Sequence, residues 1–282
     1  MRRRARWWFL VLASLLVILF VRYPRDIMQI GYRIMYATAQ SVPVFATENW
    51  VMVEEGHFRL YYQPADQAVV ADVADDLEAS LLALRGNWDY GSSRRPIVVF
   101  LYPSQKEMAD ALAGAEGLAL GAYRLGRLYL LSPLAWQPQL SAQAATAFYA
   151  EQGPVVHELV HLLLDQLVAG NTPLWFSEGL AQYWELQIKG YLWCEQGMDW
   201  RSHTVPLEQL DQRLQSGDAY AAYRQSLSLV AHLYDAYGDS AVEQIVVELS
   251  RGRTMEQAMI LSIGVDRKSF ETEWRATLSA AE

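Results

Sequence analysis

The stretch that decides the fold of this 282-residue chain is PVVHELVHLLLDQL, residues 154–167. Its apolar residues recur at helical spacing directly after Gly153, which indicates a largely buried helix. His157 and His161 are four residues apart, so both imidazoles lie on one helix face and can share one tetrahedral metal ion. Glu158 can then reach a water molecule at that ion. The pattern predicts a metal-binding helix, and the alternative is a core helix with two hydrogen-bonded histidines.

A catalytic zinc site needs a third protein ligand and an open position for water. The segment PLWFSEGLAQYW, residues 173–184, offers Glu178. We expect Ser177 to cap a helix whose first turn bears Glu178, and the loop 170–173 to fold this helix back on the first. A glutamate in a first helical turn can instead simply complement the helix dipole. Because an HExxH helix precedes it, we favour the ligand role and expect one Zn²⁺ bound by this glutamate and the two histidines.

The sequence ahead of this helix alternates between strand and helix patterns. Residues 57–62 and 96–102 have the composition of strands, and residues 66–85 between them have helical spacing. A helix is expected after Ser104, with Glu107 at capping-box spacing, and residues 121–132 resemble a hairpin or strand. Helical periodicity dominates after about residue 139. We therefore expect an α+β fold in which a mixed-sheet half precedes a helical half, as one domain over residues 51–282.

The N-terminus reads MRRRARWWFLVLASLLVILFVRYPR, with an uncharged apolar run over residues 7–21. As a helix this run spans only about 22 Å of a hydrocarbon core of roughly 30 Å, but flanking aromatic residues and arginines can extend it. No small-x-small cleavage site follows closely, which argues against a signal peptide. We expect a cytoplasmic basic tail and transmembrane anchor over residues 1–25 and a membrane-proximal connector over residues 26–50. A buried core helix is the alternative.

Charge and cysteine content exclude several classes of protein. The net charge is -9, although residues 1–25 contain six arginines and no acid, so the body is more acidic still. An acidic body repels phosphate backbones, and we expect no nucleic-acid partner. The single cysteine excludes an intrachain disulfide and a cysteine-rich zinc site. With the basic end in the cytoplasm, the body is expected outside it, on the periplasmic side of a bacterial inner membrane or at the cell surface.

HELVHLLL, residues 157–164, followed by PLWFSEGLAQYW resembles the gluzincin metallopeptidases, specifically membrane-associated bacterial proteins with a peptidase MA-like domain, over roughly residues 55–250. The resemblance implies a zincin-like fold and a peptide or protein substrate. It also implies His157, His161 and Glu178 as zinc ligands and Glu158 as the general base. An edge strand at 127–131 would receive the substrate as an added β-strand.

The segment DAYAAYRQSL, residues 218–227, resembles the family segment in which a tyrosine approaches the active site. A phenol there would stabilise the oxyanion of the tetrahedral intermediate. We expect this role for Tyr223, with Tyr220 as the second choice. Packing is the alternative role for either tyrosine, since the chain has 16 of them.

The chain also departs from the family pattern. The sixteen residues between His161 and Glu178 are slightly fewer than in gluzincin aminopeptidases, and residues 117–131 lack their Gly-x-Met-x-Asn motif, so recognition of a free N-terminus is not expected. Gln182 stands where related enzymes often carry a carboxylate that bonds a zinc histidine. Its carbonyl oxygen is expected to orient the imidazole. Asp165 is an alternative acceptor, or a solvated helix residue.

These patterns favour a membrane-anchored zinc metallopeptidase that uses a metal-activated water and a glutamate base. The alternative is a catalytically inactive, membrane-tethered scaffold or binding module with the same fold, and a third hypothesis is hydrolysis of a non-peptide amide. The intact Glu158 favours an enzyme, because metal binding needs only the ligands. The remaining histidines, His57, His203 and His232, are expected to be structural.

Overall fold

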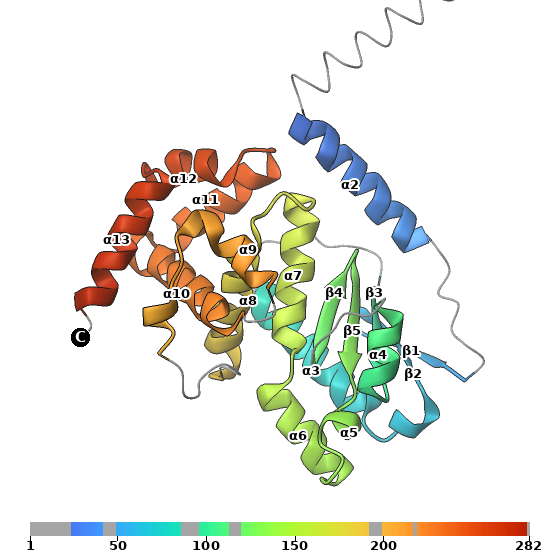
Figure 1. Cartoon of the computed structure of the whole chain (residues 1–282). Helices are drawn as coiled ribbons and strands as arrows, with labels where there is room; N and C mark the ends of the chain where they lie inside the picture. The colour runs from blue at the N-terminus through green and yellow to red at the C-terminus, as the bar shows by residue number, and fades with distance from the viewer. Residues whose placement is uncertain are drawn as a thin grey trace, which may run out of the picture.

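A five-stranded mixed sheet forms one half of the body (Figure 1). The computed structural model describes residues 24–41, 49–85, 96–112, 120–191, 199–216 and 219–280. The spatial order β1-β2-β3-β5-β4 has a parallel centre and antiparallel pairs at both edges. The strands are β1 (Val51–Glu55), β2 (Phe58–Tyr62), β3 (Ile97–Tyr102), β4 (Gly121–Arg124) and β5 (Arg127–Leu131). A sheet followed by helices confirms the predicted α+β fold.

Two features of the sheet differ from the sequence prediction. The sequence does not predict β1, because VMVEE is exposed at four of five positions and carries no alternation of apolar and polar residues. Residues 127–131 do form a strand, but β5 pairs with both β3 and β4. The expectation that residues 127–131 are an edge strand is therefore wrong. The edge beside the helical half is β4, to which β5 is joined by a turn with left-handed φ at Leu125 and Gly126.

The helices of the first half follow their local sequence signals. A 3-10 turn at Pro64–Asp66 precedes α3 (Val70–Arg85), so the predicted helix over 66–85 begins four residues late. α3 connects the parallel strands β2 and β3 and buries its apolar face against β2 and α7. α4 (Gln105–Ala111) begins at Ser104, whose hydroxyl oxygen accepts the Glu107 N–H at 3.2 Å, which confirms the predicted cap.

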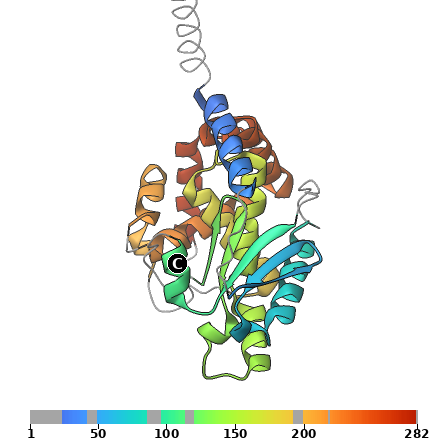
Figure 2. The same ribbon diagram turned by 90° about the vertical axis from the view of Figure 1, so that its right-hand side faces the viewer.

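The second half consists mainly of helices (Figure 1, Figure 2). α7 lies between the sheet and the other helices, in contact with β4, β5 and α8, and its leucines and valines join a core that runs through both halves. This packing places the HExxH helix beside the β4 edge. The helices are α5 (Pro133–Trp136), α6 (Ala142–Gln152), α7 (Val155–Val168), α8 (Leu174–Lys189), α9 (Leu210–Leu214), α10 (Tyr220–Tyr237), α11 (Asp239–Ser250), α12 (Met255–Ile263) and α13 (Arg267–Ala280), with 3-10 turns at Arg201–His203 and Leu207–Gln209.

The predicted connector contains a helix that packs on the body, α2 (Pro24–Ser41). The Gln29 amide donates to the carbonyls of Val168 (3.0 Å) and Leu249 (3.3 Å), near the ends of α7 and α11. The Gln40 amide donates to the Leu125 carbonyl (2.8 Å) in the β4–β5 turn. The predicted transmembrane anchor, residues 7–21, lies outside the described residues. Within the described part of the chain, no helix is both long enough and apolar enough to span a bilayer.

Candidate metal centre

The two histidines of the HExxH motif lie one turn apart on α7. Their ring centroids are 4.8 Å apart and the ring planes meet at 77°. The neighbouring Val156, Leu159 and Val160 are completely buried, so packing on the other faces fixes the rotation of the helix. This geometry confirms the predicted helix and the shared face of its histidines.

A short turn reverses the chain between α7 and α8. Ala169 and Gly170 have φ of 51° and 74°, the left-handed region that ends many helices. α8 then begins at Leu174 with Pro173 at its N-cap position. Glu178 therefore lies in the second turn. The prediction that Ser177 caps this helix is wrong, because the helix starts one turn earlier than expected.

Glu178 completes a cluster with the two imidazoles. Its Oε2 lies 3.4 Å from His157 Nε2, and its Oε1 lies 3.7 Å from His161 Nε2. One ligand atom from each residue falls within 4.8 Å of the other two. A tetrahedral zinc site with bonds of about 2.0–2.1 Å has neighbouring ligand atoms about 3.3–3.4 Å apart. The donor types and distances therefore fit a single ion of that size.

The electrostatics of the cluster favour a cation. Burial lowers the pKa of His161 to about 4, so its Nε2 lone pair is available at neutral pH. Burial also acts to lower the pKa of His157, but Glu178 and Glu185 outweigh it and raise that pKa well above its usual value. Burial opposes ionisation of Glu178, yet the two imidazoles hold its pKa below the ordinary range. The site thus combines the ionised carboxylate of Glu178 with the unprotonated Nε2 of His161, and metal binding requires ligands in these forms.

Each histidine has a partner at its second ring nitrogen. His161 Nδ1 lies 2.9 Å from the Ser177 hydroxyl, and His157 Nδ1 lies 3.6 Å from Glu185 Oε2. Glu185 is buried, and its Oε2 has no hydrogen-bond partner within the described residues. Such outer partners fix ring orientation and increase ligand basicity. Sequence reasoning missed both roles, although Glu185 is two helical turns beyond Glu178 and therefore on the same face.

The two acceptors that the sequence proposes make other contacts. The Gln182 amide nitrogen donates to the carbonyls of Glu178 (3.1 Å) and Tyr223 (2.9 Å), and its oxygen has no hydrogen-bond partner within the described residues. Asp165 accepts hydrogen bonds from the hydroxyls of Tyr32 (2.7 Å) and Tyr123. Gln182 does not orient His157 or His161 as predicted, because it joins α8 to α10. Asp165, predicted as either an acceptor or a solvated helix residue, instead joins α7 to α2 and β4.

Glu158 is buried beside the edge strand. Its side chain is 6% exposed, and burial raises its pKa to about 7. A Cβ added to Gly121 of β4 would lie 2.7 Å from Glu158 Cγ and 2.9 Å from Oε1. Glycine at 121 therefore leaves room for the carboxylate. The sequence does carry a signal for Gly121, because a glycine within a strand often marks a place where another group approaches the backbone closely.

Tyr223 lies in the first turn of α10, which crosses α8 at close range. Gly179 of α8 faces the backbone of α10 so closely that an added Cβ would lie 2.4 Å from the Ser226 carbonyl oxygen. The Tyr223 carbonyl also accepts a hydrogen bond from the Gln182 amide of α8. These contacts bring the start of α10 beside the turn of α8 that follows Glu178. The ring of Tyr223 is half-buried against the core. Its role at an oxyanion, like that of Tyr220, stays a prediction.

The other three histidines lie apart from the cluster. His57 contacts Glu78, His203 is exposed beside Ser202, and His232 stacks near Phe270, where burial lowers its pKa. These contacts agree with the structural roles predicted for all three.

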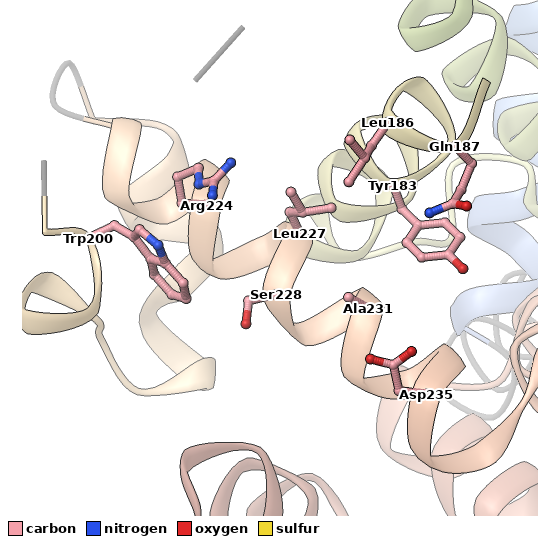
Figure 3. Close-up of a pocket in the computed structure, with 9 residues that line it drawn as sticks. All are labelled: Tyr183, Leu186, Gln187, Trp200, Arg224, Leu227, Ser228, Ala231 and Asp235. Atoms are coloured by element: carbon pink, nitrogen blue, oxygen red, sulfur yellow. The ribbon is translucent and has the colours of Figure 1, made fainter. Parts of the chain in front are cut away.

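A separate pocket of about 390 Å³ opens between α8 and α10 (Figure 3). Tyr183 and Gln187 reach it from the side of α8 opposite Glu178, since they are five and nine residues further along a helix of 3.6 residues per turn. None of the three clustered residues lines it. The lining residues are Tyr183, Leu186, Gln187, Trp200, Arg224, Leu227, Ser228, Ala231 and Asp235.

A buried HExxH glutamate beside a His-His-Glu cluster on two consecutive helices is a metallopeptidase-like site. In agreement, residues 141–280 match the family model of the Peptidase MA superfamily, from the Ser141 cap of α6 to the end of α13. The helical half is thus similar to a peptidase MA-like domain, and the matched range does not include the sheet. No curated protein sequence matches the chain.

Proposed function

We propose that this protein is a membrane-anchored zinc metallopeptidase of the gluzincin type. The observation that supports this proposal best is the cluster of two imidazoles and one carboxylate. The carboxylate oxygens of Glu178 lie 3.4 Å from His157 Nε2 and 3.7 Å from His161 Nε2, and Glu158 is buried beside them. His157 and His161 would bind the ion through Nε2 and Glu178 through a carboxylate oxygen. A bound Zn²⁺ would polarise the scissile carbonyl and make water acidic enough to attack at neutral pH.

Glu158 is the proposed general base. A carboxylate whose pKa is raised to about 7 can both accept a proton from the attacking water and return it to the leaving amine. Its burial behind β4 excludes bulk water from this exchange. Tyr223 is the proposed donor to the oxyanion of the tetrahedral intermediate.

The substrate is proposed to be an extended peptide that pairs with β4. No described strand pairs with the outer edge of β4, and strand addition at such an edge supplies main-chain hydrogen bonds without demanding a particular sequence. At Gly121, which begins this edge, any added side chain would overlap the Glu158 side chain. A peptide added there would therefore pass close to the base.

The anchor proposed at residues 7–21 would place this activity at the membrane. The arginines ahead of it favour a cytoplasmic N-terminus, and the catalytic domain would then lie outside the cytoplasm. A substrate in the envelope or at the membrane surface is expected for such an enzyme.

The test compares wild type with Glu158→Gln, because this change keeps side-chain size and removes the base. Zinc content should stay at one per chain, and cleavage of a peptide library, abolished by chelator in wild type, should be lost in the variant. A scaffold would bind zinc and cleave nothing in either form. Hydrolysis of amide substrates with no cleavage of any peptide would instead support the non-peptide hypothesis.

A further inference from the structure

The amphipathic character of α2 is reversed relative to a helix that packs on a protein core. The side chains that it turns toward the body are polar: Gln29, Tyr32 and Gln40 all form hydrogen bonds to it. The side chains that it turns outward are large and apolar. Met28, Ile30, Ile34 and Met35 are 61%, 57%, 62% and 48% exposed. Large apolar side chains that are exposed together on one helix mark a surface that contacts a membrane or another protein.

This outward face carries little charge. Residues 27–41 contain one charged residue, Arg33, and no acid, in a chain whose net charge is -9. Arg251 and Arg253 directly follow α11, whose Leu249 carbonyl accepts the Gln29 amide, but both are paired with Glu248 of that helix. Arg33 is therefore the cation that flanks the apolar side chains of residues 27–41, and an apolar helix face flanked by a cation fits a membrane interface.

Further exposed apolar residues lie at the same end of the molecule. Ile260 and Leu261 of α12 are 48% and 60% exposed. Both views place α2 and α12 at one end and α6 at the opposite end (Figure 1, Figure 2). The apolar run over residues 7–21 ends only three residues before α2 begins at Pro24, so the chain would emerge from a bilayer beside this surface.

We infer that the outward face of α2, together with Ile260 and Leu261, rests on the lipid surface and seats the domain against the membrane. The inference concerns a contact made by the folded body, and it extends the proposed anchoring without depending on the proposed catalysis. Tyr32 contacts Asp165 on α7, and Gln40 contacts the β4–β5 turn. The metal centre and the edge strand would therefore be held at a fixed height and orientation above the bilayer.

The test uses the full chain with Cys194→Ser, reconstituted in vesicles of phosphatidylcholine and phosphatidylglycerol. Single cysteines at Ile34, Leu261 and Leu140 carry an environment-sensitive fluorophore. Leu140 is the matched control, since it is an exposed leucine just before α6. Labels at 34 and 261 should have blue-shifted emission, several-fold protection from aqueous iodide and strong quenching by brominated lipid, whereas the label at 140 should remain aqueous.

Aqueous exposure at 34 or 261 equal to that at 140 would overturn the inference. So would protection that brominated lipid does not quench but that falls on dilution with unlabelled protein, because a second copy of the chain would then cover the face. Far-ultraviolet circular dichroism of each labelled variant confirms that the body is folded. Zinc content, measured in parallel, keeps failure of the lipid contact distinct from failure of the metal site.

Discussion

Gly121→Ala is predicted to slow hydrolysis without releasing the metal. The new Cβ would lie 2.7 Å from Glu158 Cγ and 2.9 Å from Pro154 Cβ, whereas ordinary contacts begin at 3.4 Å, so the base and the start of α7 must move away from β4 by roughly 0.7 Å. Gly121 does not have a left-handed φ, so the effect is steric and not conformational. A displacement of about 1 Å in a catalytic group costs on the order of 10²-fold in rate. We therefore expect kcat to fall by about 10- to 100-fold.

The assay combines steady-state kinetics on a cleaved library peptide with zinc analysis and thermal unfolding. Overpacking costs about 1–3 kcal/mol, so a modest loss of stability should accompany the loss of rate. Gly31→Ala is the matched control, because a Cβ there meets nothing within 4 Å, and it should leave kcat unchanged. Full activity of Gly121→Ala with zinc bound would refute the placement of Glu158 as the base against β4.

Three further changes test separate parts of the site and the fold. Glu185→Gln removes the charge facing His157 Nδ1 and should weaken zinc binding by about 10–100-fold in a chelator competition, while an unchanged affinity would mean that the carboxylate does not act on the imidazole. Tyr223→Phe should lower kcat by on the order of 10²-fold at constant zinc content, and an equal kcat would assign the ring to packing. Burial raises the pKa of Asp66, so the folded state retains its proton to higher pH than the unfolded state, and stability should fall as pH rises through the window above about pH 4. Asp66→Asn should make this fall shallower in urea unfolding, with the buried carboxyls of Asp76 and Glu158 responsible for the rest, and an unchanged slope would show that Asp66 does not contribute.

The cluster of His157, His161 and Glu178 is predictable because its geometry is local. The i, i+4 spacing of His157 and His161 fixes their shared face, and Gly170 permits the reversal that brings Glu178 back to them. Ser177 and Glu185 are not predictable in the same way. Their contacts with the imidazoles depend on how α8 crosses α7, which is decided by packing of the whole helical half.

The pairing of the sheet and the packing of α2 were not predictable from the sequence for one reason, which is that periodicity does not identify the partner of a strand or helix. The hairpin over residues 121–132 is visible in the sequence, but which of its strands joins β3 depends on pairing with residues 29 positions earlier, such as Val98 with Arg127. Likewise, the weak periodicity after residue 26 indicates a helix without showing that its polar face, with Gln29 and Tyr32, is the one that meets the body. Capping at Ser104 was predictable because it needs only residues three apart.

The most direct test of the metal centre is X-ray absorption at the zinc edge on the full chain after reconstitution. We expect one zinc per chain, with two imidazoles and carboxylate oxygen at about 2.0–2.1 Å, and loss of one imidazole in His161→Ala. A protein that binds no zinc, or a spectrum that keeps both imidazoles in His161→Ala, would contradict this expectation.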